Sequence, residues 1–481
     1  MRPPESGRGS GEKALSAAAS MLVGGSFIDD ANRLRSGSAE GVLPFAVSAP
    51  STLGTWLGSF TWVHVRQLDR VHELALSRAW SARERRVERR FGPVGGQNGY
   101  GVTVAEIHGS CEVGFEGVRD AFSTNFDEGD LGASCAVVHR GELVVDLWGG
   151  HRDVAATKPW ERDTIVNVWS TTKMMAALCV LVLHDRGALS VDDPVAAHWP
   201  EFAAAGKEAV LIRHLMSHTA GLAGFDPPIT EEQMYDWDHC CANLAAQTPW
   251  WEPGTASGYH ASTQGWLLGE VVRRVAGRTL GAFFREEIAE PLGADFHIGL
   301  ADSEFDRVAE MSTDEADEIG DGKQPIPARR ARGEAEHSQF VNTDRWRRAE
   351  FPASNGHGNA RSVAEVVSIL AQGGESQGIR FLGPSTIERI FEVQASGPDL
   401  VLGYNTKFGI GYGLNSKAMP LGINDRTLFW AGWGGSMAVV DVENSLTVCY
   451  AMNRMMSDVV GGMRAGRVIF AAHDAGTALR A

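Results

Sequence analysis

The chain has 481 residues, of which 43% are hydrophobic and 22% are charged, and its formal net charge at pH 7 is −16. This length and composition allow a large buried core and exclude a wholly disordered protein. The negative charge argues against nucleic acid as the main partner, and no apolar run reaches the ~18 residues of a membrane span, so we expect no stable membrane insertion.

The first hundred residues differ in composition from the rest of the chain. They are rich in glycine, serine and arginine, and apolar residues recur at roughly helical spacing in the arginine-rich run from Arg66 to Arg90. We predict that residues 1–100 form an extension that is poorly ordered or loosely docked; the alternative is a basic amphipathic helix for a membrane surface or a partner. Residues 13–28 resemble a signal-peptide core only faintly, because serine and glycine interrupt them and no clean cleavage site follows.

Regular patterns run from about residue 105 to 475, and we expect one domain over this range. Apolar periodicity predicts helices, and short apolar or alternating runs predict strands. The predicted helices cover 113–126, 170–186, 263–276, 360–372 and 459–472, and the predicted strands cover 133–147 (a hairpin), 428–430, 437–441 and 446–450. Strands near both ends predict one sheet subdomain over 105–188 and 352–475, with a mainly helical insert over 189–351.

The six cysteines are scattered along the chain and include no Cys-x-x-Cys pair. In a chain of this size they are typical of buried thiols in a reducing compartment and not of a disulfide framework. We therefore expect a cytoplasmic protein, and the oligomeric state stays open.

The stretch from Trp169 to Lys173 reads Trp-Ser-Thr-Thr-Lys and opens an almost wholly apolar predicted helix. Ser170 and Lys173 share a face because they are about one helical turn apart. A serine hydroxyl becomes nucleophilic when a neighbouring base accepts its proton, and a buried lysine amine can serve as that base. The pattern predicts Ser170 as a nucleophile with Lys173 as its partner; the alternative is a helix-capping serine beside a lysine that reaches solvent.

A second polar site lies on the loop from Glu252 to Ser262, where a Pro-Gly turn places Tyr259 just before a predicted helix. A nearby cation favours the ionised form of a phenol, so Tyr259 is a candidate proton acceptor. The alternative is a loop tyrosine that only packs its ring. His260, the next residue, either tunes Tyr259 or lines the pocket.

The third motif is the glycine-rich run from Trp430 to Ser436, next to a predicted strand. Small residues let a substrate approach the backbone, and two N–H groups aimed at one carbonyl oxygen form an oxyanion hole. The alternative is a glycine-rich turn between strands.

Two further patterns are set aside. The run from Gly374 to Gly378 matches Gly-x-Ser-x-Gly, but it follows a predicted helix and not the strand that a nucleophile elbow requires. His214 and His218 have helical spacing, but no glutamate accompanies them, so we expect no metal site there.

The ordered set of Ser-x-x-Lys, a tyrosine in a Pro-Gly-Thr loop and a late glycine-rich strand motif resembles the serine β-lactamase and penicillin-binding-protein superfamily. The class C-like branch, and family VIII carboxylesterases within it, resembles the chain most, also in residues 212–222, 352–358 and 408–413. The resemblance covers roughly residues 105–475. It implies a β-lactamase/transpeptidase-like α/β (α+β) fold, in which helices flank an antiparallel sheet and a mainly helical domain is inserted.

The resemblance also implies roles for individual residues. Ser170 would be the acylated nucleophile, Lys173 and Tyr259 the proton-transfer pair, and the backbone N–H groups of Ser170 and Trp433 the oxyanion hole. The substrate pocket would be lined by Trp430, Gly432, His260 and Trp169.

Two departures from the superfamily pattern bear on the substrate. Ala261 stands where a penicillin-handling relative would have asparagine, and Trp430-Ala431-Gly432 replaces Lys-Thr-Gly. Loss of a charged partner for a substrate carboxylate weakens the binding of anionic lactams. We therefore expect a carboxylesterase for short-to-medium acyl esters, without metal or cofactor. The alternatives are a β-lactamase, D-amino-acid peptidase or acyltransferase with the same site, or a non-catalytic scaffold or sensor.

Overall fold

The computed structural model describes residues 105–313, 340–456 and 462–479. All of them belong to one compact unit, Thr103–Ala481. The predictions for residues 1–100, including the basic helix and the signal-like segment, lie outside the described residues, as does the start of the predicted C-terminal helix.

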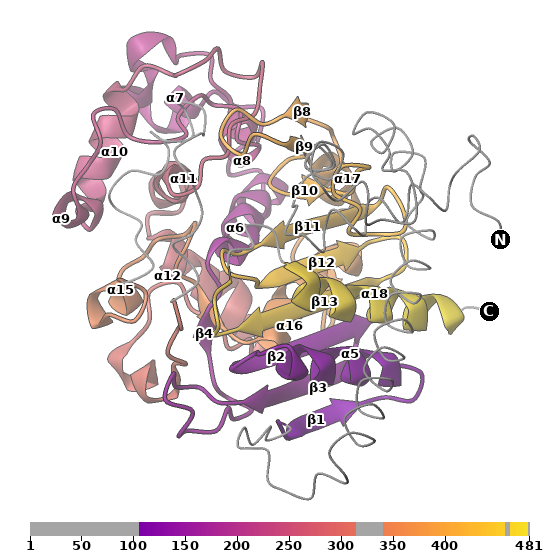
Figure 1. Ribbon diagram of the computed structural model, residues 1–481. Helices are drawn as coiled ribbons and strands as arrows, with labels where there is room; N and C mark the ends of the chain where they lie inside the picture. The colour runs from indigo at the N-terminus through magenta and orange to yellow at the C-terminus, as the bar shows by residue number, and fades with distance from the viewer. Residues whose placement is uncertain (1–104, 314–339, 457–461, 480–481) are drawn as a thin grey trace, which may run out of the picture. The chain divides into compact units, whose positions relative to one another are not determined.

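A nine-stranded antiparallel sheet forms the centre of this unit (Figure 1), in the order β1-β3-β2-β13-β12-β11-β10-β9-β8. Strands β2 and β13 pair from His139 opposite Leu446 to Ala133 opposite Met452, so segments near both ends of the domain complete one sheet. The strands are β1 (Ile107–Cys111), β2 (Gly132–His139), β3 (Glu142–Gly150), β8 (Ala395–Pro398), β9 (Asn405–Phe408), β10 (Gly413–Leu414), β11 (Thr427–Ala431), β12 (Met437–Asp441) and β13 (Leu446–Met452). Two short pairs lie apart from this sheet: β4 (Val166–Asn167) with β5 (His357–Gly358), and β6 (Glu375–Ser376) with β7 (Ile379–Arg380).

Helices cover both faces of the sheet, because β2, β12 and β13 are buried at every position. On one face, α5 (Glu116–Asp127) packs against α18 (Gly462–Ala478), and on the opposite face α16 (Ala360–Ala371) packs on β2, β12 and β13 (Figure 1). The helix α6 (Lys173–Asp185) is buried from Lys173 to Leu183 and contacts both α16 and α11 (Thr263–Ala276). The predicted helices 263–276 and 360–372, the hairpin 133–147 and the three C-terminal strands are confirmed.

The described elements from residue 195 to 348 are helical, and Figure 1 shows them beyond one end of the sheet, with α6 between the two. They are α7 (Val195–His198), η4 (Pro200–Gly206), α8 (Ile212–Met216), α9 (Glu231–Met234), α10 (Trp237–Ala246), α11, α12 (Leu280–Phe284), η5 (Arg285–Ala289), α13 (Glu290–Leu292), η6 (Asp302–Arg307) and α15 (Asp344–Arg348). One further helix, α17 (Pro384–Ile390), precedes β8. The six cysteines are free, and all except Cys111 are buried.

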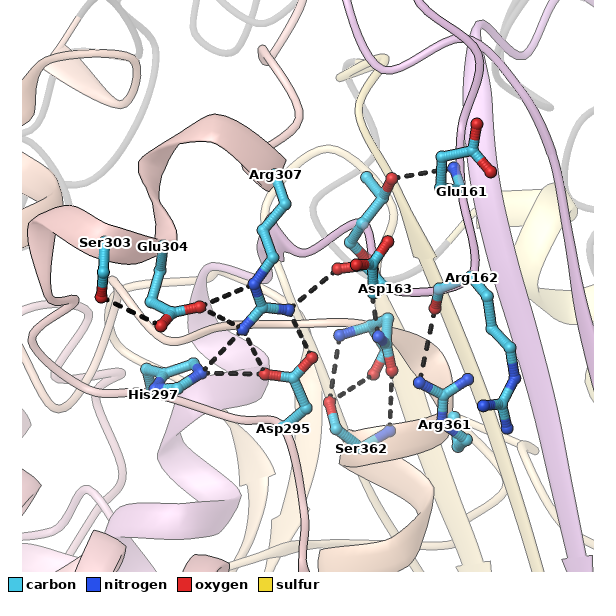
Figure 2. A network of polar contacts seen from close by, with 12 residues as sticks. Glu161, Arg162, Asp163, Asp295, His297, Ser303, Glu304, Arg307, Arg361 and Ser362 are labelled. Atoms are coloured by element: carbon cyan, nitrogen blue, oxygen red, sulfur yellow. Dashed lines mark hydrogen bonds and ion pairs between the residues drawn. The ribbon is translucent and has the colours of Figure 1, made fainter.

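A polar network joins the helical region to the segment that leads into β4 (Figure 2). Arg307 donates hydrogen bonds to Asp295, 2.6 Å from Nη2 to Oδ1, and to the carbonyl oxygen of Asp163, 2.9 Å from Nη1. Burial raises the pKa of Asp295, but hydrogen bonds from His297 and Arg307 outweigh burial and hold the pKa well below its usual value. The network therefore fixes the approach to β4, which ends just before Ser170.

Candidate active site

Ser170 lies where β4 passes into a short helical turn, η3 (Ser170–Thr172), that continues as α6. The preceding residue, Trp169, has φ 47° and ψ −133°, a left-handed conformation that costs a residue with a Cβ ~1–3 kcal/mol. Packing offsets this cost, since the buried Trp169 ring lies 5.6 Å from the Trp346 ring and 5.1 Å from the Trp433 ring. The sharp turn presents the half-buried Ser170 at the start of a buried helix.

Lys173 lies one turn after Ser170 and is only 1% exposed. Its Nζ atom donates to Ser170 Oγ at 3.1 Å, to the Ala261 carbonyl oxygen at 2.5 Å and to the Ala353 carbonyl oxygen at 2.9 Å. An ammonium group has three N–H donors, and these three uncharged oxygens match them. Lys173 is thus held as a buried cation directly behind the serine hydroxyl.

Tyr259 reaches the same serine from the loop that precedes α11. Its hydroxyl lies 2.8 Å from Ser170 Oγ, and its ring centroid lies 5.0 Å from Lys173 Nζ. The structure therefore brings together the three side chains that the sequence predicts as catalytic.

Asp399 anchors the Tyr259 loop and has no signature in the sequence. Its buried Oδ1 atom accepts backbone N–H groups from Tyr259 at 3.0 Å, Val401 at 3.0 Å and Leu402 at 2.9 Å. One carboxylate oxygen thus ties the Tyr259 loop to the segment that follows β8. Asp399 is the last residue of a Gly-Pro-Asp sequence, which is a turn signal. This turn signal does not reveal the contact between Asp399 and Tyr259.

His260 is fully buried behind Tyr259, which corrects the prediction that it lines the substrate pocket. Its Nε2 atom accepts the Leu222 N–H at 3.1 Å, and its Nδ1 atom lies 2.6 Å from the Gly258 carbonyl oxygen. Burial lowers the pKa of His260 to about 4, so the ring is neutral at pH 7 and carries its proton on Nδ1. Its role is to hold the backbone of the Tyr259 loop.

His218, which the sequence offers only as half of a metal pair, packs against Tyr259 with ring centroids 5.0 Å apart. Burial lowers its pKa well below the usual value, and the nearby His260 and Lys173 lower it further. His214 instead accepts the Leu211 N–H at the start of α8. Among the described residues, no group of three or more histidine, cysteine or acidic side chains is placed to hold a metal ion.

The turn between β11 and β12, residues 432–436, lies against the start of η3. Ser436 Oγ donates to the Val168 carbonyl oxygen at 2.8 Å and lies 3.1 Å from Thr171 Oγ1. A Cβ atom on Gly432 would lie 2.3 Å from that Val168 oxygen and 2.2 Å from Ser436 Oγ. The close approach of the turn to the nucleophile segment therefore requires glycine at this position.

The backbone N–H groups of Ser170 and Trp433 donate to no atom of the described residues. For Ser170 this follows from its place at the first position of a helix, where N–H groups have no intrahelical acceptor. These are the two groups that the sequence predicts as the oxyanion hole, and two free donors are what such a hole requires.

A buried ion pair supports the turn from the side of α18. Arg464 Nη2 donates to the Gly434 carbonyl oxygen at 2.7 Å, and Nη1 pairs with Asp130, which also accepts the Tyr450 hydroxyl. Burial raises the pKa of Asp130, and the Arg464 charge opposes that shift. Arg464 therefore fixes the backbone next to the Trp433 N–H without reaching the site itself.

A cavity of about 50 Å³ opens beside Tyr259 and Trp430. The Trp430 ring stacks on Phe408 with centroids 5.8 Å apart and lies 6.1 Å from the Tyr259 ring. Of the four residues predicted to line the substrate pocket, Trp430 borders this cavity, whereas Gly432 and Trp169 lie at the contact between the turn and the helix start.

The family model described as Beta-lactamase matches residues 118–473. Esterase/beta-lactamase LipL of Mycobacterium tuberculosis (strain ATCC 25618 / H37Rv) is 33% identical over 376 residues, which cover 75% of this chain and 86% of the relative. Within the described residues, no helix is both long enough and apolar enough to cross a bilayer.

Two solved structures cover 77% of this chain and 100% of their own chains, each with a TM-score of 0.73. One is a family VIII carboxylesterase, 41% identical to this chain. The other is a penicillin-binding-protein homologue from Caulobacter crescentus, 40% identical.

Proposed function

The chain belongs to the beta-lactamase family, and from this premise we propose that it is a serine carboxylesterase for short-to-medium acyl esters, acting through an acyl-enzyme on Ser170. One observation carries the proposal: Ser170 Oγ lies 2.8 Å from the Tyr259 hydroxyl and 3.1 Å from Lys173 Nζ. A nucleophile within hydrogen-bonding distance of its base is the geometry that covalent catalysis requires.

In the acylation step, Ser170 Oγ attacks the ester carbonyl carbon, and its proton passes into the Tyr259–Lys173 pair. The Lys173 ammonium already has an acceptor for each N–H group, so the base is the ionised form of Tyr259, whose negative charge the Lys173 cation stabilises. The phenolate oxygen takes the Ser170 proton and becomes a neutral phenol. The carbonyl oxygen becomes negative and is stabilised by the N–H groups of Ser170 and Trp433. The ester C–O bond then breaks, and the departing alkoxide takes the proton from Tyr259.

In the deacylation step, a water molecule takes the place of the alcohol. Tyr259 accepts a proton from this water as its oxygen attacks the acyl-enzyme carbonyl. The bond to Ser170 Oγ breaks and the serine recovers its proton, which releases the carboxylic acid.

Neutral esters are the substrates that the site chemistry favours. The side chains at Trp430 and Ala431 carry no charge, and Ala261 contributes only a methyl group and the carbonyl that holds Lys173. A β-lactam carboxylate would therefore lack the cationic partner that Lys-Thr-Gly relatives offer. β-Lactam hydrolysis is the second candidate, because the name of the relative LipL includes it.

The test compares Ser170→Ala with Ser376→Ala, the serine of the discarded Gly-x-Ser-x-Gly run. We expect Ser170→Ala to lower p-nitrophenyl butyrate hydrolysis by about 10⁴-fold or more and to lose labelling by a fluorophosphonate, while Ser376→Ala behaves as wild type. If Ser170→Ala keeps ester turnover or fluorophosphonate labelling, the assignment of Ser170 as the nucleophile is wrong. If the fluorophosphonate does not label the wild-type protein, a scaffold or sensor is favoured. A higher kcat/KM for nitrocefin than for the butyrate ester would favour a β-lactamase.

A further inference from the structure

The cavity beside Tyr259 shares two lining residues with a larger groove. The cavity is lined by Tyr259, Leu402, Tyr404, Thr406, Lys407, Phe408, Gly413, Met419, Phe429, Trp430 and Ala431. A groove of about 420 Å³ is lined by Tyr404, Asn405, Ala418, Met419 and Leu421. Tyr404 and Met419 border both spaces, so they stand at the passage between them, and the groove alone has a volume typical of small-molecule sites.

The position of the cavity relative to Tyr259 determines whether the cavity binds the alcohol half or the acyl half of an ester. In the proposed reaction, Tyr259 gives its proton to the departing alkoxide, so the alcohol oxygen must lie within hydrogen-bonding distance of the Tyr259 hydroxyl. The cavity is lined by Tyr259, by residues of β9, β10 and β11, and by Met419. An alcohol group attached to that oxygen can therefore extend into it.

The lining selects an uncharged, apolar group. The lining includes the aromatic residues Phe408, Phe429 and Trp430, of which Phe408 and Trp430 stack on one another, and such rings bind apolar and aromatic groups through large contact areas. Lys407 also borders the cavity, and its Nζ atom donates to the Asn415 carbonyl oxygen at 3.5 Å. Tyr404 is 37% exposed, so the passage communicates with solvent.

We propose that this passage is the alcohol-binding site, and that the enzyme prefers esters of bulky apolar or aromatic alcohols over methyl and ethyl esters. The inference rests on the proposed esterase function, because it takes Tyr259 as the proton donor to the alcohol. It assigns substrate selection to residues 402–421, a segment that none of the three sequence motifs contains.

The experiment varies the two halves of the ester separately. One series keeps the butyrate acyl group and changes the alcohol from methanol to ethanol and 2-naphthol; the other keeps p-nitrophenol and changes the acyl group from acetate to octanoate. All esters of the first series form the same acyl-enzyme, so kcat/KM within it reports acylation alone. The variants are Met419→Trp, which fills the passage, and Met419→Ala, which widens it.

We expect Met419→Trp to lower the kcat/KM ratio of 2-naphthyl butyrate to methyl butyrate by about tenfold, and Met419→Ala to keep or raise that ratio. Both variants should keep the wild-type order of acyl preference. Ile423→Ala is the matched control, because Ile423 is an exposed apolar residue of the same loop that borders neither space.

Two results would overturn the inference. An altered acyl-length order with an unaltered alcohol ratio would place the acyl chain in the passage, and unaltered behaviour of both Met419 variants in both series would remove the passage from substrate binding. If the proposed esterase function through Ser170 is itself wrong, the result is different: ester turnover survives in Ser170→Ala.

Discussion

Lys173 and Lys207 are the two lysines that lie fully inside the described part of the chain, at 1% and 0% exposure. Both ammonium groups donate hydrogen bonds to backbone carbonyl oxygens. Lys207 Nζ donates to the carbonyl oxygen of Ala204 at 2.9 Å and to that of Gln247, and it lies 5.2 Å from the Phe202 ring centroid. Lys173 adds one partner of another kind, the Ser170 hydroxyl at 3.1 Å. Burial of a lysine is therefore not a mark of catalysis by itself, and the adjacent serine, the nucleophile of the proposed mechanism, distinguishes Lys173.

The two lysines also serve different parts of the molecule. Lys207 ties the end of η4 to Gln247 at the end of α10, within the helical region. Lys173 ties α6 to the carbonyl oxygens of Ala261 and Ala353, which belong to two loops far apart in the sequence. The same hydrogen-bonding chemistry therefore stabilises a helix junction in one place and positions a reactive group in the other.

The largest expected effect tests this difference directly. Lys173→Met should lower kcat/KM for p-nitrophenyl butyrate by about 10³-fold, because the proton-transfer pair loses its cation. Lys207→Met removes a buried cation of the same type and should keep kcat within about twofold for the folded enzyme. Urea unfolding of both variants separates activity from folding. A folded Lys207→Met enzyme as inactive as Lys173→Met would abolish the distinction.

Tyr259→Phe should have the next largest effect. The variant keeps the ring that packs on His218 and Trp430 but removes the hydroxyl 2.8 Å from Ser170 Oγ. We expect kcat to fall by about 10²-fold, the lower end of the range for loss of a general acid–base group. Activity close to wild type would show that Lys173 alone transfers the proton. Tyr235→Phe, on a tyrosine outside the site, serves as the control.

Arg464→Lys should have a smaller effect that acts through the backbone. Lysine keeps a charge beside Asp130, but its donors all lie on one nitrogen, so it lacks the planar fork that reaches Asp130 and the Gly434 carbonyl oxygen from two separate nitrogens. The Gly434 carbonyl then loses its restraint, and we expect kcat to fall about tenfold with little change in KM. Affinity for an alkylboronic acid, which mimics the oxyanion, should fall in parallel while the urea midpoint changes little. Retained boronate affinity would show that Arg464 does not position the Trp433 N–H.

The smallest expected effect is a pH dependence of stability that belongs to Lys207. Burial lowers its pKa from 10.5 to about 8. Between these values the unfolded chain binds more protons than the folded one, so the contribution of Lys207 to the free energy of unfolding rises with pH from about 8 to 10.5 and is constant below. Urea titrations at pH 7.5, 9 and 10 should show this rise in wild type and its loss in Lys207→Met. Equal slopes in the two proteins would contradict it.

Whether a contact in the site can be predicted from the sequence depends on the kind of contact. Ser170 and Lys173 are predictable because helix geometry alone puts them on one face, and the helix 263–276 is predictable from its apolar spacing before Gly277, which has φ 71°. Tyr259 is a candidate from its loop alone, but its meeting with Ser170, like the place of Trp433, is implied only by the order of motifs in the family, since sequence spacing does not fix a meeting in space. The beta-lactamase fold followed from the same resemblance, and the comparisons confirm it.

Other parts of the site could not be predicted. Asp399 and Arg464 act on backbone N–H and carbonyl groups, which every residue has, so no residue pattern marks their targets. The left-handed turn at Trp169 was missed because glycine usually marks such positions, and here packing between Trp346 and Trp433 holds a tryptophan in it. His260 was misplaced because sequence adjacency to Tyr259 does not reveal that its ring points into the core.

The contact between Ser436 and the Val168 carbonyl has a consequence for the synthesis of the protein. The ribosome releases Ser170 and Lys173 long before β11, β12 and β13, and until β13 arrives the central strand β2 has only one of its two neighbours. Sheets closed by such distant segments form late in folding. A nascent chain therefore carries the serine and its lysine without the turn of residues 432–436, and under the proposed mechanism it cleaves no ester until the sheet is complete.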